Sequence, residues 1–477
     1  MGEADCMQPA IIQPNGWAAA RPGDKLHTGP REPGMIIAML TLSDHHGHEL
    51  ARRASPGHLV SITACLVCCV PLLVLALRGW ANAVLYLGAL GGLLALAWGE
   101  LPRLQLPARE RRWAQVMVLV LAAPIVTVAF SALLRLDPYL PQFDSPLRFL
   151  LAIPIFLLVL RSGWPVGRTM QWVLPLALLV ALLELQVVGQ DPKWPTFRLT
   201  THAVDPLVFG YFSLAFGLMC LASIAPGDWR EGRRWSVVLR LAALALGVYF
   251  SVKSFSRTGW AAVPLVIGTW AYVHWGRRHP LGSLGVAAGV ALMLVGAYLF
   301  VPSVEFRIDE AIRDVVEYPW NGVLQRETSL GYRITFLRIA TDLLASNPWA
   351  GLGDFSRLPP PLHAFPYAAP EAVTYGFRSG FHNQVVSSAV RNGVGGLVAT
   401  GALLVVPWLI CARAALRGPG APSKVAMMGL AYCTCVIVSS LSTEVFDLKF
   451  AASFYAVMTA VFCAASLRAS AGAATPD

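Results

Sequence analysis

Charged residues are scarce in this sequence. Asp, Glu, Lys and Arg make up only 13% of the 477 residues, whereas 56% are hydrophobic. A soluble domain carries about 25% charged residues, so this chain lacks the polar side chains that would cover a water-facing surface. The composition therefore excludes a soluble enzyme, a disulfide-stapled secreted domain and a disordered protein.

Several sequence motifs that carry chemistry are also missing. The predicted outer loops contain no Asp-x-Asp pair, His-Glu-x-x-His, Cys/His cluster at metal spacing, Gly-x-Ser-x-Gly or P-loop. Metal-assisted sugar-nucleotide chemistry and ATP hydrolysis thus lack support, and we expect neither metal nor cofactor. No nucleic-acid motif accompanies the net charge of +10. We attribute that charge to cytoplasmic loops and lipid phosphates, so membrane lipids are the expected partners and nucleic acid is not.

What the chain does contain is a series of apolar runs of about twenty residues, each long enough to cross a bilayer as a helix. The runs are continuously apolar, whereas the strands of a membrane β-barrel alternate apolar and polar residues. The sequence thus predicts an all-α, polytopic integral membrane protein with about twelve transmembrane helices. The predicted spans are 59–77, 80–98, 114–134, 147–160, 172–189, 206–225, 235–251, 259–275, 281–301, 394–411, 424–441 and 448–467.

Two hydrophilic stretches stand outside these spans. Residues 1–50 are predicted to be a disordered cytoplasmic extension of a membrane domain over 51–477. Residues 302–393 form a large loop before the last three spans. With the N-terminus inside, the short cytoplasmic loops hold roughly twice as many Lys and Arg residues as the opposite loops, as the positive-inside rule requires. We therefore expect both termini in the cytoplasm and the large loop in the periplasm.

Two amphipathic helices are expected in the large loop. In the first, the apolar residues share one face: Val304, Ile308, Ala311, Ile312 and Val315. The second should run over 332–345 and stop at Asn347-Pro348. Its predicted apolar face comprises Phe336, Leu337, Ala340, Leu343 and Leu344. Arg333 projects toward that same face, where it would need an anionic partner or would snorkel at the helix end.

Cations and one histidine at the outer membrane surface are the candidates for chemistry. Lys253 and Arg257 lie within five positions of each other at the start of a predicted span, where charges are either functional or anchored to lipid headgroups. His382 precedes the tenth span, and an imidazole can accept a proton near neutral pH. A lone histidine at an interface can equally be a structural hydrogen-bonding group. Arginine forks match the oxygens of a diphosphate.

Four short motifs follow in order between residues 250 and 401. They are Ser256-Arg257-Thr258-Gly259-Trp260, Gly331-Tyr332-Arg333, Asn347-Pro348-Trp349-Ala350-Gly351-Leu352-Gly353, and His382-Asn383 with Gly393 and Gly396. In this order, with some twelve spans and a large outer loop, the chain resembles the O-antigen ligase and polymerase superfamily of integral membrane glycosyltransferases. The first five spans contain no motif of that superfamily.

The resemblance implies a metal- and ATP-independent glycosyltransferase of the inner membrane with a periplasmic active site. O-antigen ligases move O-antigen polysaccharide from undecaprenyl diphosphate to a sugar hydroxyl of lipid A-core, which completes lipopolysaccharide. On this basis Arg257 and Arg333 are expected to hold the donor diphosphate, with Arg198 and Lys253 as weaker candidates and Arg148 weaker still. His382 is expected to act as general base, or as an imidazolium that contacts the diphosphate. Asn383 could orient the ring or a substrate.

The motifs do not select the acceptor. An O-antigen polymerase and a protein O-oligosaccharyltransferase would use the same lipid-linked donor, so both remain alternatives to the ligase. A polytopic transporter is the alternative outside enzymes. Transporters place charges near the membrane midplane, in broken helices or internal repeats, and the sequence shows neither pattern clearly.

Overall fold

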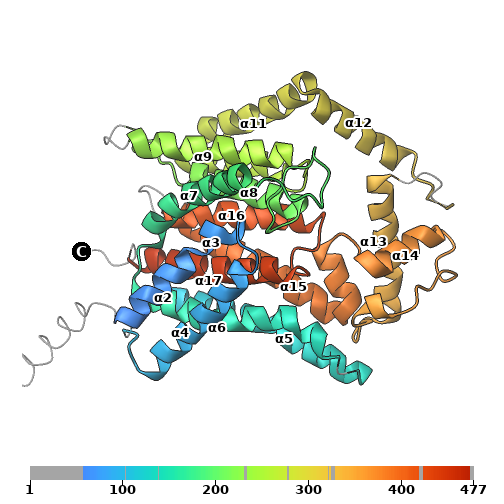
Figure 1. Ribbon diagram of the computed structural model, residues 1–477, viewed down its shortest axis with the longest axis horizontal. Helices are drawn as coiled ribbons and strands as arrows, with labels where there is room; N and C mark the ends of the chain where they lie inside the picture. The colour runs from blue at the N-terminus through green and yellow to red at the C-terminus, as the bar shows by residue number, and fades with distance from the viewer. Residues whose placement is uncertain are drawn as a thin grey trace, which may run out of the picture. The chain divides into compact units, whose positions relative to one another are not determined.

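A computed structural model of the chain describes residues 57–472, apart from residues 103, 138, 230–233, 277–278, 321, 324–327 and 418–422. The predicted cytoplasmic extension over residues 1–50 lies outside the described residues. Throughout the described ranges the regular elements are helices, and no strand occurs among them (Figure 1). The predicted all-α polytopic class is thereby confirmed.

The helices follow the predicted spans closely. Those before the large loop are α2 (His58–Cys68), α3 (Val70–Val74), α4 (Trp80–Ala97), α5 (Ala108–Arg135), α6 (Asp144–Ser162), α7 (Val166–Val187), α8 (Pro206–Ala222), α9 (Arg234–Lys253), α10 (Ala262–His274) and α11 (Pro280–Phe300). The loop contributes α12 (Pro302–Val316), α13 (Ser329–Ser346) and α14 (Pro370–Ser379), and the chain continues with α15 (Gln384–Leu416), α16 (Lys424–Ser440) and α17 (Lys449–Gly472).

Eight helices in the described part of the chain are long and apolar enough to cross a membrane. Four shorter apolar helices, α2, α8, α10 and α16, match further predicted spans, and α3 continues α2. The total of twelve spans remains a prediction. The fourth predicted span proves longer than expected, because α6 accommodates Pro154 and runs over 19 residues.

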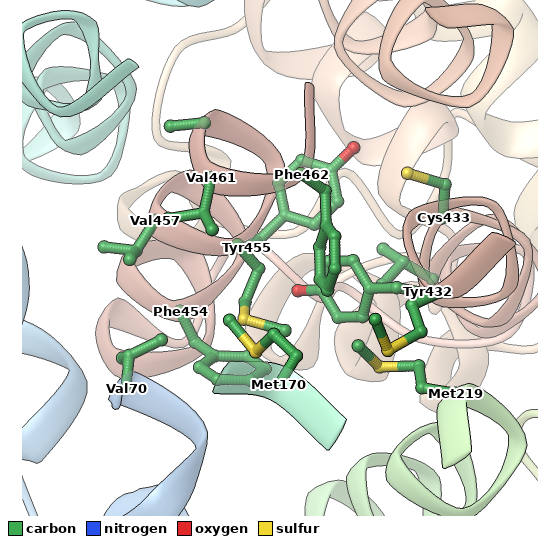
Figure 2. Packing of buried hydrophobic residues seen from close by; sticks show 14 of the residues in the cluster. Val70, Met170, Met219, Tyr432, Cys433, Phe454, Tyr455, Val457, Val461 and Phe462 are labelled. Carbon is green, nitrogen blue, oxygen red and sulfur yellow. The ribbon is translucent and has the colours of Figure 1, made fainter. Parts of the chain in front are cut away.

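Helix α17 is the central helix of the bundle. In its most apolar stretch 89% of the residues are buried, and it packs against α4, α6, α15 and α16. Figure 2 shows Phe454, Tyr455 and Phe462 of α17 gathered with Tyr432 of α16. The rings of Tyr432 and Tyr455 stack with centroids 6.0 Å apart, and the Tyr455 hydroxyl donates to the Leu403 carbonyl of α15 at 2.7 Å. These contacts fix the helices that begin or end near the large loop.

The end of the bundle away from the large loop is held by buried ion pairs. Glu110 at the start of α5 is 2% exposed and pairs with Arg413 of α15 and with Arg417, which directly follows that helix. Asp228, after α8, contacts Lys424 of α16 at 2.5 Å. Because these carboxylates are buried and paired, removing a partner would leave an uncompensated charge. The pairs therefore hold helices distant in sequence together.

The large loop has an apolar core of its own. It joins α13, α14, the segment between them and the start of α15, through Phe336, Ile339, Phe355, Phe377, Phe381 and Val390 among others. The predicted second helix is confirmed as α13, which begins at Ser329 and ends before Asn347.

The orientation of that helix differs from the expectation. Ile339 is fully buried on α13, whereas Leu337 is 56% exposed. The side that packs against α14 is therefore rotated toward Ile339. Arg333 was expected on the packed face, but its side chain is exposed instead. The sequence alone could not locate α14, which sets this rotation.

The predicted end of the loop at residue 393 falls at a break inside a longer helix. Helix α15 begins at Gln384, ten residues before the predicted span, and it contains a non-helical break at Asn392 and Gly393. The first two turns of α15 thus belong to the large loop and pack with α13, while the part after Gly393 matches the predicted span.

Candidate active site

His382 occupies the sharp connection between α14 and α15. Its backbone adopts φ = +51°, a left-handed conformation that is uncommon for a residue with a side chain. The flanking residues hold this turn. The Phe381 amide donates to the Ser387 hydroxyl at 3.2 Å. The Asn383 side chain accepts from the amides of Val385 and Val386 at 3.0 and 3.1 Å, and so caps α15.

Asn383 also donates to the Leu441 carbonyl at 3.4 Å, which ties the turn to the segment between α16 and α17. Its amide is thus committed to the backbone. It fixes the position of His382 through the chain, and within the described structure the two side chains form no hydrogen bond with each other. A role of Asn383 toward substrate stays a prediction.

Aromatic rings surround the imidazole of His382. The ring centroids of Phe336 and Tyr375 lie 6.0 and 5.5 Å from the centroid of the imidazole. The Nε2 atom lies 3.3 Å from the Tyr375 hydroxyl. Tyr332, Phe336 and Tyr375 also stack on one another with centroids about 6 Å apart. The half-buried imidazole therefore has an apolar wall on one side and an open approach on the other.

Arg333 lies near this imidazole, one turn before Phe336 on α13. Burial among the aromatic rings lowers the pKa of His382, and the positive charge of Arg333 lowers it further. The imidazole is therefore mostly neutral at pH 7. Partial desolvation also lowers the pKa of Arg333, although an arginine remains charged at neutral pH. No carboxylate in the described part of the chain forms an ion pair with Arg333.

Arg257 lies in the turn between α9 and α10, and two buried serines anchor this turn. The Ser254 hydroxyl donates to the Ser251 carbonyl at 2.8 Å, and the Ser256 hydroxyl donates to the Leu207 carbonyl of α8 at 3.1 Å. Gly210 of α8 leaves the space for both serines, since a Cβ there would overlap them. With the turn fixed from below, Lys253 and Arg257 are left exposed.

Arg198 is brought onto the same turn. The Leu199 amide donates to the Lys253 carbonyl at 3.0 Å, and the Arg198 Nε donates to the Ser254 carbonyl at 3.5 Å. The guanidinium also lies 5.9 Å from the ring centroid of Trp194. Arg198, Lys253 and Arg257 therefore gather at one place on the bundle, although 55 residues of chain separate Arg198 from Lys253.

Arg148 is placed apart from the other candidates. It is 4% exposed on α6 and donates to Asn82 of α4 at 2.8 Å, to Ser453 of α17 at 2.7 Å and to Asp144 at 2.9 Å. Its guanidinium thus joins three helices inside the bundle. The structure does not bring Arg148 to the turn that carries Arg257.

A large apolar groove connects the turn of Arg257 with α13. It encloses about 570 Å³ between Arg257 and Trp260 on one side and α12 and Leu330 on the other. The α12 residues that line it are Val304, Ile308, Ala311, Ile312, Val315 and Val316. The predicted apolar face of the first loop helix is therefore confirmed. Leu330 is the α13 residue that lines the groove, and Arg333 follows it three residues later on the same side of the helix.

The segments Asn347–Gly353 and Arg391–Gly393 are joined by hydrogen bonds between their backbones and those of neighbouring residues. The Val394 amide donates to the Pro348 carbonyl at 2.7 Å, and the Leu352 amide donates to the Val390 carbonyl at 2.8 Å. Gly393 has φ = +63°, and a Cβ there would overlap the Pro348 carbonyl. These glycines thus permit close backbone contact after α13, and the motifs shape the support beneath His382.

The sequence did not predict a network of charged residues that is linked to the turn of His382 through Phe381 and Ser387. Arg391 contacts both carboxylate oxygens of Asp447, at 2.5 and 2.6 Å, and Glu444 at 3.5 Å. The Ser387 hydroxyl donates to Glu444 and accepts from the Phe381 amide. Burial, together with the nearby Asp447, raises the pKa of Glu444. Burial alone would raise the pKa of Asp447, but the positive charge of Arg391 and the hydrogen bonds of Asp447 together have the larger effect and lower it. The available sequence signal was the presence of two acidic residues, Glu444 and Asp447, in the short loop between two apolar spans.

Residues 241–401 match the family model described as O-Antigen ligase. The match supports membership of the O-antigen ligase and polymerase superfamily. This superfamily region contains Lys253, Arg257, Arg333, His382 and Asn383, while Arg148 and Arg198 precede it. The recognition made from the motifs is thus confirmed, and it supports a polytopic membrane protein with O-antigen ligase or polymerase-type function.

An uncharacterized protein of Haemophilus influenzae is 24% identical over 277 residues, which amount to 56% of this chain. The aligned region covers 65% of the length of that protein, so the chain spans less than two thirds of this relative. The superfamily placement therefore rests on the region that holds the candidate site.

Proposed function

We propose that the protein is an O-antigen ligase. It would transfer O-antigen polysaccharide from undecaprenyl diphosphate to a sugar hydroxyl of lipid A-core, at the periplasmic face of the inner membrane, without metal or ATP. Both termini would then lie in the cytoplasm. The observation that carries the proposal is the half-buried imidazole of His382 close to Arg333, which has no ion-pair partner among the described residues. The apolar groove that Arg257 lines reaches Leu330, three residues before Arg333 on the same helix.

The groove suits the donor lipid. Its walls are apolar along α12, and hydrocarbon is favoured in such a groove by about 25 cal/mol for each Å² removed from water. At its mouth Arg257 offers a guanidinium fork that matches phosphate oxygens. A prenyl chain along α12 would thus place the diphosphate between Arg257 and Arg333. Arg198 and Lys253 add positive charge on the side of Arg257.

The reaction we propose is a single displacement. The oxygen of the acceptor hydroxyl forms a bond to the anomeric carbon of the donor sugar, and the bond from that carbon to the diphosphate oxygen breaks. The leaving diphosphate takes the electron pair, and Arg257 and Arg333 stabilise the charge that builds on it. The proton of the acceptor hydroxyl passes to His382.

Because Nε2 contacts Tyr375, we propose that Nδ1 accepts this proton. In the tautomer in which Nε2–H donates to the Tyr375 hydroxyl, Nδ1 carries the free lone pair. We assign this tautomer to the resting enzyme. The aromatic wall of Tyr332, Phe336 and Tyr375 would then face the apolar side of a sugar ring, as aromatic rings do in many sugar sites.

Purified protein supplied with lipid-linked O-antigen and lipid A-core tests the proposal. Covalent O-antigen on lipid A-core is the expected product. A longer undecaprenyl-linked chain, with nothing joined to lipid A-core, would favour an O-antigen polymerase, and a modified pilin-like protein would favour a protein O-oligosaccharyltransferase. Movement of the lipid-linked donor across the membrane without covalent transfer would reject the enzyme in favour of a transporter.

A further inference from the structure

A second cavity is lined by Trp194. It encloses about 320 Å³ between the connection of α3 to α4, the segment 191–205 and the start of α17. We call it the Trp194 pocket. The lining residues that matter here are Arg78, Trp80, Lys193, Trp194 and Lys449. Trp194 lines this pocket, and its ring centroid lies 5.9 Å from the guanidinium of Arg198. The pocket is therefore next to one of the candidate active-site residues.

Three cations from three separate segments converge on the Trp194 pocket. Arg78 and Lys193 are exposed, and no carboxylate of the described ranges forms an ion pair with either of them. The ammonium group of Lys193 lies 5.7 Å from the ring centroid of Trp194. Lys449 contacts Asp144 at 2.6 Å, but its side chain is 68% exposed. Its remaining hydrogens can therefore be donated to a ligand.

The carboxylates in the same pocket are already engaged by backbone amides. Asp205 accepts from the amides of Leu207 and Val208 at 2.9 and 3.0 Å and caps α8. Asp191 accepts from the Lys193 amide at 3.0 Å. These bonds use one oxygen of each carboxylate, while the cations of the pocket have hydrogens left for an anion.

The pocket also has an apolar and aromatic side. The Trp80 indole is fixed by a hydrogen bond to the Val70 carbonyl at 3.1 Å, and the neighbouring Leu77 is 50% exposed. Tryptophan and basic residues together are typical of the boundary between hydrocarbon and headgroups. Cations above an apolar rim match an amphiphile whose phosphate faces the pocket and whose hydrocarbon remains in the bilayer.

We propose that the Trp194 pocket binds a phosphate group carried by a membrane amphiphile, at a site separate from that of the donor diphosphate. The shared chemistry is a phosphate, from a lipid headgroup, a phosphorylated glycolipid or the free ion. Leu77 and Trp80 favour a phosphate that is attached to hydrocarbon. The proposal does not depend on the transfer reaction.

Binding of dihexanoyl phosphatidic acid to the full-length, detergent-solubilised protein tests this site. The double variant Arg78→Gln/Lys193→Gln removes two exposed cations that have no ion-pair partner in the described structure, so the fold should persist. Since each basic residue near an anionic headgroup contributes about fivefold, the double variant should bind at least tenfold more weakly. Arg168→Gln is the matched control, because Arg168 is exposed at the start of α7 and does not line the pocket.

Two comparison ligands separate the possible outcomes. Dihexanoyl phosphatidylcholine, which has no net charge, should bind more weakly than phosphatidic acid, and the double variant should not affect it. Inorganic phosphate that binds as tightly as phosphatidic acid would overturn the amphiphile and assign the pocket to the free ion. Unchanged affinity in the double variant would overturn the site. This binding assay contains no glycosyl donor, so its outcome is independent of the transfer assay. Failure of transfer would contradict the proposed ligase but would not change the measured binding of phosphatidic acid.

Discussion

Arg333 of α13 lies close enough to His382, at the start of α15, for its charge to lower the pKa of the imidazole. The two residues are 49 positions apart, and the apolar core shared by α13, α14 and α15 brings them together. A cation beside a base keeps the base unprotonated, and the same cation can receive the charge of the leaving group. The first prediction follows from this pairing.

The acid limb of the pH profile should report His382. Because burial and Arg333 lower its pKa, transfer should rise with pH below about 6.5, the ordinary histidine value, and level off near neutrality. In Arg333→Gln the charge is gone, so the pKa rises and the limb moves to higher pH, whatever the maximal rate. Arg378→Gln, an exposed change on α14, should leave the limb in place. An activity that falls with rising pH over this range would instead indicate an imidazolium that contacts the diphosphate.

Neutralising Arg257 or Arg333 should slow transfer. Arg257→Ala and Arg333→Ala should each lower the rate by about 10²-fold or more, because each removes stabilisation of the departing diphosphate. Rates should be measured in membranes with matched protein levels, with Arg378→Ala as the control. Near-normal transfer by both variants would mean that the diphosphate binds elsewhere.

The apolar groove should discriminate by the length of the donor lipid. Ile308→Gln places an amide on its α12 wall and should raise KM for the undecaprenyl-linked donor by about tenfold, since it weakens hydrocarbon burial. A donor with a short prenyl chain should be unaffected by this change. Arg313→Gln lies on α12 but outside the groove lining and serves as control. Equal effects on long and short donors would show that the chain does not occupy the groove.

Gly393→Ala should destabilise the support of the candidate site. Alanine at φ = +63° costs about 1–3 kcal/mol, and its Cβ would also overlap the Pro348 carbonyl. A lower thermal unfolding temperature and loss of transfer are expected together. Gly401→Ala, later in α15, has open space around the new methyl group and should be neutral or slightly stabilising. Identical unfolding temperatures for the two variants would contradict the interlocked arrangement of the motifs.

Much of the fold followed from local sequence. The spans were predictable because a helix that crosses a bilayer must be long and apolar. The face of α12 that lines the groove was predictable because its apolar residues repeat with the period of a helix. Arg257 and His382 were found because cations and a lone imidazole beside apolar spans are conspicuous. The superfamily resemblance then joined Arg333 to them.

The remainder depended on contacts between distant segments. Arg148 looked like a surface cation, yet its partners Asn82 and Ser453 are 66 and 305 residues away. The burial of Ile339 instead of Leu337 depended on where α14 packs. The network of Ser387, Arg391, Glu444 and Asp447 could not be inferred either, because no local pattern links two segments separated by two spans.

The central claim is that His382 accepts the proton of the acceptor hydroxyl. Its most direct test compares purified wild-type protein with His382→Gln, with lipid-linked O-antigen and lipid A-core both saturating. The measured quantity is the rate at which undecaprenyl diphosphate is released with O-antigen joined to lipid A-core. Loss of a general base typically costs 10²–10⁴-fold, so the variant should fall within that range while it keeps its fold and its binding of the donor. Full transfer by His382→Gln would contradict the account.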